Sequence, residues 1–183
     1  IEVTEVEMTD PGANFVIFFD ENEIYNGQLG CQANMSTKGW VIDRATIKIS
    51  PSFRGQIDNC IIHEALHAFG HYWMIYVERQ PWGKVLHSMA RSARDFLPAL
   101  NDLHSRIALS FPGVTMPQFR TEAVAGGGVR VHYFSSREGF GPFVHGVLEG
   151  IGAMYGEIVQ VSHVEDRARG AAHDVFLVEF PGG

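Results

Sequence analysis

Positive charge and cysteine are both scarce in this chain of 183 residues. It carries 14 lysine and arginine residues against 21 aspartate and glutamate residues, a formal net charge of −7. Nucleic acid and anionic membrane surfaces attract an excess of basic side chains, so the composition disfavours both as partners. Cys31 and Cys60, the only two cysteines, permit one disulfide at most. We expect a cytoplasmic protein, with these early cysteines keeping an exported protein open as the alternative.

Long apolar runs are also missing. Residues 14–19 and 61–69 are the longest such stretches, and both are far shorter than the roughly 20 residues that a membrane-spanning helix needs. The chain opens at Ile1 without a basic segment followed by an apolar one, so we expect a leader to be absent or already removed. Hydrophobic residues nevertheless make up 45% of the chain, which suffices for a sizeable core. We therefore expect a globular protein outside the membrane.

The first third of the chain is predicted to be rich in strands and to end in a helix. Residues 14–19 and 39–50 have the β-branched and aromatic content of strands. From Asp58 the apolar residues follow a helical period instead. The apolar stripe consists of Ile61, Ile62, Ala65, Leu66 and Phe69.

This helix contains the pattern HEALHAFGH. The spacing H-E-x-x-H places His63 and His67 one turn apart, where both can bind one zinc ion, and Glu64 beside them as the catalytic base for a bound water. His71 is the candidate third ligand if the helix ends at Gly70. The order of strands and helix over residues 30–71 resembles that of zincin-like metallopeptidases. The alternative, a helix with partly exposed histidines and no metal, stays open.

The remaining chain is predicted to form helices and then a sheet. Residues 85–109 have a helical period with a boundary at Pro98, and residues 118–124 and 129–134 form a hairpin across three glycines. A charged segment, residues 165–169, is expected to be a solvated hairpin tip.

Two features of this region predict a heme site. His104 lies among apolar helix positions, and an imidazole there is an iron ligand or a core residue bonded to a carbonyl. In an extended chain, Tyr133, Ser135 and Arg137 point to one side. Their hydroxyls and guanidinium suit carboxylates, which a heme supplies as propionates. A polar strand edge that faces water is the alternative.

Residues 64–180 resemble the heme-nitric oxide/oxygen binding (H-NOX) domains, which are related to the sensor domain of soluble guanylate cyclase. The resemblance is carried by AFGHYW (68–73), DLHSRIALSFP (102–112), HYFSSREG (132–139), VHGVLEG (144–150) and DVFLVEF (174–180), and by the spacing between His104 and Tyr133. It implies heme b as cofactor, His104 as the proximal iron ligand, Pro117 against the porphyrin, and a propionate clamp of Tyr133, Ser135 and Arg137.

The resemblance also implies a gas selectivity and an output. Oxygen-binding members place a tyrosine hydroxyl over the heme, and that place falls to Phe143 here, with Val147 beside it. A wall without a hydrogen-bond donor predicts selectivity for nitric oxide and carbon monoxide. Gas binding would break the bond between His104 and iron, and the signal would pass to a histidine kinase or a cyclase.

We therefore predict an α+β protein with a strand-rich N-terminal segment, a helical middle, and a C-terminal antiparallel sheet with a covering helix. Residues 1–63 form the zincin-like segment and residues 64–183 the H-NOX-like region. The leading hypothesis is a heme-based gas sensor that is not itself an enzyme. The alternative is a zinc-dependent metallopeptidase that uses His63, Glu64 and His67.

Overall fold

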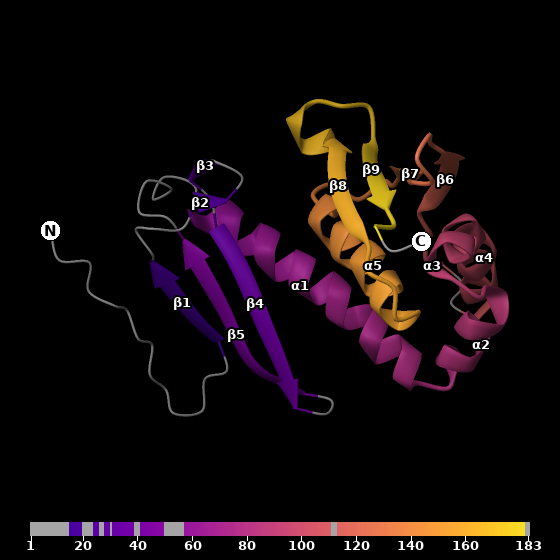
Figure 1. Cartoon of the computed structure of the whole chain (residues 1–183), viewed down its shortest axis with the longest axis horizontal. Coiled ribbons are helices and arrows are strands. Elements are labelled where there is room, and N and C mark those ends of the chain that lie inside the picture. The colour runs from indigo at the N-terminus through magenta and orange to yellow at the C-terminus, as the bar shows by residue number, and fades with distance from the viewer. Residues whose placement is uncertain are drawn as a thin grey trace, which may run out of the picture. The chain divides into compact units, whose positions relative to one another are not determined.

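The computed structural model divides the chain into two compact units, residues Ile1–Ala68 and Phe69–Gly183. Secondary structure is described for residues 15–19, 24–25, 28–29, 31–38, 41–49, 57–110 and 113–181, and side chains for residues 62–110 and 113–181 (Figure 1). Cys31 and Cys60 lie outside the described side chains. Within the described ranges, no helix combines the length and apolar character needed to cross a membrane.

The first unit contains a three-stranded sheet and a small hairpin. Its strands are β1 (Phe15–Phe19), β2 (Ile24–Tyr25), β3 (Gln28–Leu29), β4 (Cys31–Lys38) and β5 (Val41–Ile49). β5 pairs parallel with β1 and antiparallel with β4, while β2 and β3 pair with each other. The predicted strands are present as β1 and β5, but the sequence analysis missed β4. Its alternation of small or apolar residues with Gln32, Asn34 and Ser36 is a period-two signal that indicates a strand.

The helix α1 (Ile57–Arg79) begins where the sequence predicts but continues beyond Gly70. The expectation that Gly70 ends this helix is wrong. A Cβ atom added at Gly70 would overlap with the backbone oxygen of Phe143. Glycine is therefore needed at this position for close packing against another helix, and its conformational freedom is not used to stop α1.

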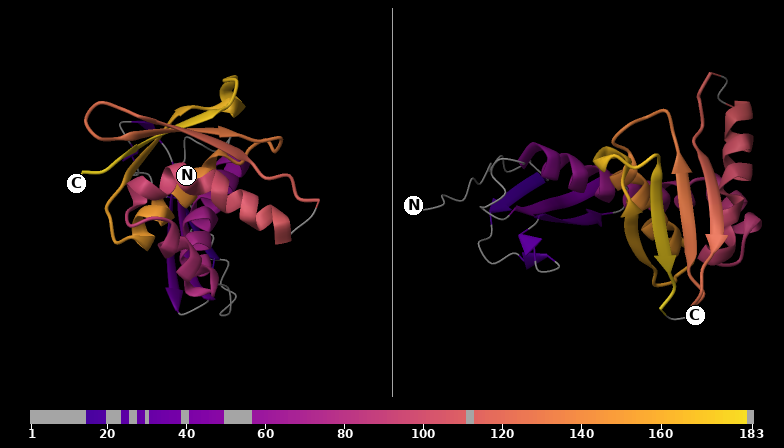
Figure 2. Two further views of the ribbon diagram at one scale, coloured as in Figure 1. Left: turned by 90° about the vertical axis from the view of Figure 1, so that its right-hand side faces the viewer. Right: turned by 90° about the horizontal axis from the view of Figure 1, so that it is seen from above.

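The second unit packs helices against one four-stranded antiparallel sheet, in the order β6-β7-β9-β8. After α1 come α2 (Trp82–Met89), α3 (Ala93–Phe96), the 3-10 turn η2 (Leu97–Ala99), α4 (Leu100–Ser110), β6 (Gln118–Ala123), β7 (Val129–Phe134), α5 (Gly141–Met154), β8 (Gln160–Glu165), η3 (Arg167–Arg169) and β9 (Asp174–Glu179). Figure 2 shows the helices of this unit on one side of the sheet, with α4 next to β6. The predicted α+β class, the hairpin and the covering helix are confirmed.

The core of the second unit combines buried side chains of α5 and the sheet with others from α1, α2, α3, η2 and α4. Side chains of α5 and of alternate sheet positions are almost fully buried there, among them Leu148, Ile151, Val131, Phe176 and Val178. Burial of each such side chain stabilises the fold by about 1.5–3 kcal/mol. This core fixes the sheet and α5 as a rigid frame, and the polar residues at its border take their positions from it.

Candidate functional site

A cavity of about 630 Å³ lies in the second unit. Its walls come from the last turns of α1 and from α2, α4, β6, β7 and α5, and most of the lining side chains are apolar, such as Leu100, Leu103, Ile107, Val144 and Leu148. The polar lining side chains include Gln80, His104, Tyr133 and Arg137. A volume of this order with apolar walls and a few converging polar groups is typical of a site for a cofactor or small molecule.

His104 faces this cavity from α4. Its Nδ1 donates a hydrogen bond to the backbone oxygen of Pro117 at 3.4 Å. Burial lowers the pKa of His104 below 6.5, and the bond to Pro117 offsets this in part. The imidazole is therefore neutral near pH 7, with its proton on Nδ1 and the lone pair of Nε2 available to a metal ion.

Asn101 joins the helix that carries His104 to the neighbouring strand. Its side-chain nitrogen donates to the backbone oxygen of Phe119 at 2.5 Å, and its side-chain oxygen accepts from the backbone nitrogen of Phe119 at 2.9 Å. Both backbone groups of one β6 residue are thus held by one side chain of α4. The sequence analysis missed Asn101, although its place three residues before His104 puts both on one face of the helix.

Phe119 connects the histidine to the second polar part of the cavity. Its ring centroid lies 5.5 Å from that of His104 and 5.3 Å from that of Tyr133. Pro117, which precedes β6, and Tyr133, which is buried in β7, both line the cavity with Phe119. The structure therefore brings His104, Pro117 and Tyr133 together, as the sequence predicts for residues of one site.

The residues after β7 form a turn, which we call the 135–139 loop. Arg137 lines the cavity, but Ser135 does not. The Ser135 hydroxyl oxygen accepts a hydrogen bond from the backbone nitrogen of Arg137 at 3.0 Å, and Gly139 has a φ of 75°. The expectation that Tyr133, Ser135 and Arg137 share one side of an extended strand is wrong for Ser135. Strand pairing ends at Phe134, so the alternation of an extended chain no longer applies beyond it.

Phe143 and Val147 contribute an apolar wall from α5. Phe143 packs against Phe140 and Phe69, with ring centroids 5.8 Å and 5.6 Å apart. Neither side chain carries a hydrogen-bond donor, so this part of the wall offers none to a molecule in the cavity.

The four residues predicted as a zinc set follow one another along α1. His63 is exposed, whereas Glu64, His67 and His71 are half-buried. Because α1 continues unbroken past Gly70, His63 and His71 lie about 12 Å apart along its axis. The bend that would bring His71 to the same ion as His63 is absent. The expectation that His71 is the third zinc ligand is therefore wrong. Among the described residues, no group that could hold a metal ion combines His63, His67 and His71.

Comparisons with known proteins connect this chain to one family. The model of the family described as Haem-NO-binding matches residues 30–163. The beta-2 subunit of soluble guanylate cyclase from Rattus norvegicus is 29% identical over 119 residues, which are 62% of this chain and 17% of that protein. The Homo sapiens beta-2 subunit is 29% identical over 103 residues, 53% of this chain and again 17% of the relative. This chain therefore spans only a small part of these relatives.

A solved structure shares the fold. The H-NOX protein from S. oneidensis in the Fe(II)NO state has a TM-score of 0.61 and 17% identity, with 72% of each chain covered. Nothing in the comparisons supports the zincin-like resemblance. The family match that begins at residue 30 instead includes His63, Glu64 and His67 in one continuous segment. The predicted division between residues 63 and 64 stays a prediction.

Proposed function

This chain belongs to the Haem-NO-binding family, and from that premise we propose that its second unit binds heme b in the cavity and senses nitric oxide and carbon monoxide. The observation that carries the proposal is the state of His104. The imidazole is neutral, its Nδ1 donates to the Pro117 oxygen, and its ring lines an apolar cavity. This is the arrangement that a histidine needs to bind an iron ion through Nε2.

The rest of the cavity fits the same cofactor. Heme combines a large apolar ring with two carboxylates, and the cavity combines apolar walls with the guanidinium of Arg137 and the hydroxyl of Tyr133. An arginine binds a carboxylate through two parallel hydrogen bonds. In this assignment Arg137 and Tyr133 hold the propionates directly. Ser135 supports them by fixing the backbone at Arg137.

Bound heme supplies an iron ion that binds diatomic gases. The chain's own residues then decide which gas is retained. Phe143 and Val147 line the cavity with apolar side chains that offer no hydrogen bond. Bound dioxygen gains much from such a bond because it carries partial negative charge, whereas nitric oxide and carbon monoxide depend on it less. The wall therefore favours nitric oxide and carbon monoxide over dioxygen.

The output is proposed to pass through α4. His104 would tether this helix to a bound heme, while Asn101 joins the helix to β6. If a bound gas released this tether, the contacts of Asn101 and Pro117 would set the position of α4, and the helix would then have two states. Guanylate cyclase subunits are among the relatives, and we propose a cyclase or a histidine kinase as the recipient of the signal. In this role the chain is a sensor and not an enzyme.

Reconstitution of the full chain with heme tests the proposal. We expect a Soret band that saturates at one heme per chain. After anaerobic reduction with dithionite, the Soret band of the ferrous protein should shift with nitric oxide and with carbon monoxide, and brief exposure to dioxygen should give no spectrum of an oxygen complex. The variant Glu64→Gln should leave all these spectra unchanged. Heme uptake without saturation, or the same spectrum with and without nitric oxide, would contradict the assignment.

A further inference from the structure

Arg167, in the turn between β8 and β9, makes contact with the 135–139 loop. Its Nη1 donates to the backbone oxygen of Ser135 at 2.7 Å, and its Nη2 donates to Oε1 of Glu138 at 3.3 Å. The sequence analysis expects residues 165–169 to be a solvated hairpin tip, and for Arg167 this is wrong, since its side chain is only 34% exposed. A guanidinium presents its donors in a rigid plane, so contacts at two places fix the loop's orientation as well as its position.

The turn that carries Arg167 is itself anchored in the core. The backbone nitrogen of Arg167 donates to Oδ1 of Asp174 at 3.0 Å, and Nε2 of His163 donates to the same oxygen at 2.9 Å. Asp174 is buried, and it pairs with Tyr133 in the sheet. The ring of His163 stacks on that of Phe176, with 4.3 Å between the centroids. Arg167 therefore extends from a fixed point of the sheet, directly beside the strand that leads into the loop.

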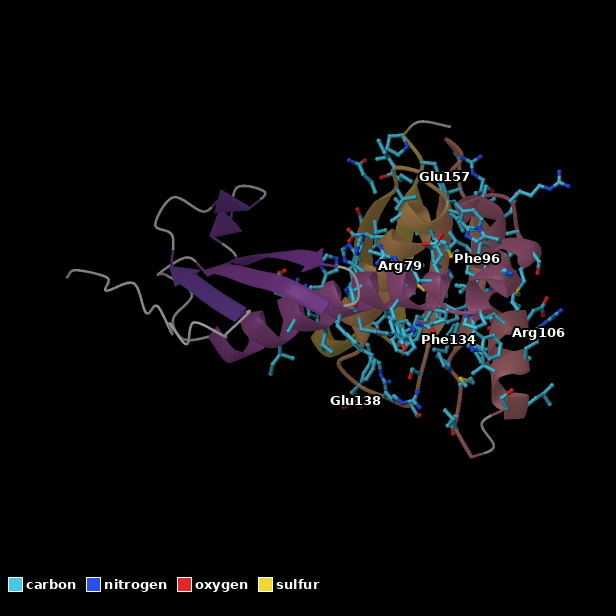
Figure 3. All side chains as sticks on the ribbon, turned by 90° about the horizontal axis from the view of Figure 1, so that it is seen from below. Arg79, Phe96, Arg106, Phe134, Glu138 and Glu157 are labelled. Carbon is cyan, nitrogen blue, oxygen red and sulfur yellow. The ribbon has the colours of Figure 1, made fainter. Side chains whose placement is uncertain are left out.

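The hydrogen bond from Arg167 acts on Ser135, the residue that shapes the 135–139 loop. Arg167 holds the carbonyl of Ser135, and the hydroxyl of Ser135 holds the backbone nitrogen of Arg137. Figure 3 shows Glu138 at the periphery of the second unit, and its side chain is 84% exposed. The loop thus has one half-buried attachment, at Ser135, and one exposed attachment, at Glu138. The bond to Ser135 is the shorter of the two and is better shielded from water.

We propose that Arg167 is a positioning residue, which holds the 135–139 loop so that the guanidinium of Arg137 faces the cavity. The claim about the loop stands on the contacts above. The claim that Arg137 then meets a heme carboxylate rests on the proposed function. Without Arg167 the loop samples other conformations, and Arg137 loses the orientation that lets it bind a carboxylate in the cavity.

The first test uses the heme-free full chain. Hydrogen exchange at the Arg137 amide should be about ten-fold faster in Arg167→Ala than in the wild type, because the loop loses the charge-assisted hydrogen bond to Ser135, the residue whose hydroxyl binds this amide. Arg169→Ala is the matched control, since Arg169 lies in the same turn with its side chain 88% exposed. Glu138→Ala removes only the exposed contact and should have a smaller effect than Arg167→Ala. It also remains informative if Arg167→Ala fails to fold.

The second test uses the chain loaded with heme and measures the transfer of heme to apomyoglobin. Loss should be about ten-fold faster from Arg167→Ala, only slightly faster from Arg167→Lys, which keeps one donor for Ser135, and unchanged from Arg169→Ala. The Soret maximum should stay at its wild-type position because His104 is untouched.

Unchanged exchange at Arg137 in Arg167→Ala would overturn the positioning role, whether or not heme binds. Equal effects of Arg167→Ala and Arg169→Ala would overturn it as well. A wild-type chain that binds no heme would contradict the proposed function instead, and the exchange result would still decide the role of Arg167.

Discussion

The cavity holds its polar groups in two contrasting ways. In the region of His104, burial keeps the imidazole neutral and one backbone carbonyl fixes its tautomer. In the region of Arg137, the charge is kept and hydrogen bonds fix the backbone, from Ser135 inside the loop and from Arg167 outside it. The first region presents a lone pair and the second presents a cation. One apolar cavity can therefore hold a metal ion and a carboxylate of the same molecule.

The largest expected effect is at the neutral region. Among the residues that the structure describes, His104 is the only histidine that lines the cavity. In His104→Ala we expect loss of the wild-type Soret band, with partial recovery when free imidazole is added. His87→Ala is the control, because this histidine is bonded to Glu78 and does not line the cavity. If His104→Ala kept the wild-type spectrum, His104 would not be the iron ligand, and the contrast between the regions of His104 and Arg137 would not hold.

A hydrogen-bond donor placed in the apolar wall should change gas selectivity. In Phe143→Tyr we expect dioxygen affinity to rise about ten-fold or more, since a hydrogen bond to a charged group contributes roughly 1.5–3 kcal/mol. Oxygen titration monitored by absorbance measures this. Phe143→Leu, which changes the wall without adding a donor, should not gain dioxygen affinity, and an equal gain in both variants would show that selectivity does not depend on a donor.

Loss of the cation should weaken retention without changing the iron ligand. Arg137→Ala is expected to release heme about ten-fold faster, with the Soret maximum unchanged. Arg130→Ala serves as the control, because Arg130 is exposed on β7 and does not line the cavity. A shifted Soret maximum in Arg137→Ala would mean that the two regions are not independent.

The smallest expected effect is the pH dependence of the heme-free chain. Burial lowers the pKa of His104 below 6.5, so the unfolded state binds a proton there more readily than the folded state does. The contribution of His104 to the free energy of unfolding is therefore lost as the pH falls from about 6.5 towards the lowered pKa. His104→Gln should lose less of its free energy of unfolding between about pH 7.5 and pH 5.5 than the wild type loses. Urea denaturation at both pH values measures these losses. Equal losses in the variant and the wild type would show that burial of this imidazole does not contribute to the pH dependence of stability.

The two regions also differ in how far the sequence predicts them. The elements that carry His104 and Tyr133 could be predicted, because a helical period and a hairpin with a glycine turn are local signals, whereas Pro117 was expected only from the family resemblance. The direction of Ser135 could not, since it depends on where the pairing of β7 with β6 ends. The role of Gly70 depends on a helix that lies far away in the sequence. Arg167 was missed for the same reason, because its partners are Ser135 and Glu138.

The zinc hypothesis fails because a local pattern was taken as evidence of a complete site. A spacing of histidines along one helix is also a local signal, but a shared metal site needs a third ligand that the spacing does not supply. The unbroken helix α1 keeps His71 away from His63. Local patterns predicted the elements well, while the arrangement of side chains around a site depended on contacts between elements.

The bond between His104 and iron is the central claim, and resonance Raman spectroscopy of the ferrous, gas-free protein tests it most directly. We predict an iron–histidine stretching band that shifts when histidine is labelled with nitrogen-15, disappears in His104→Ala and persists in His87→Ala. A band that survives unchanged in His104→Ala, or a wild-type spectrum without any such band, would contradict the account.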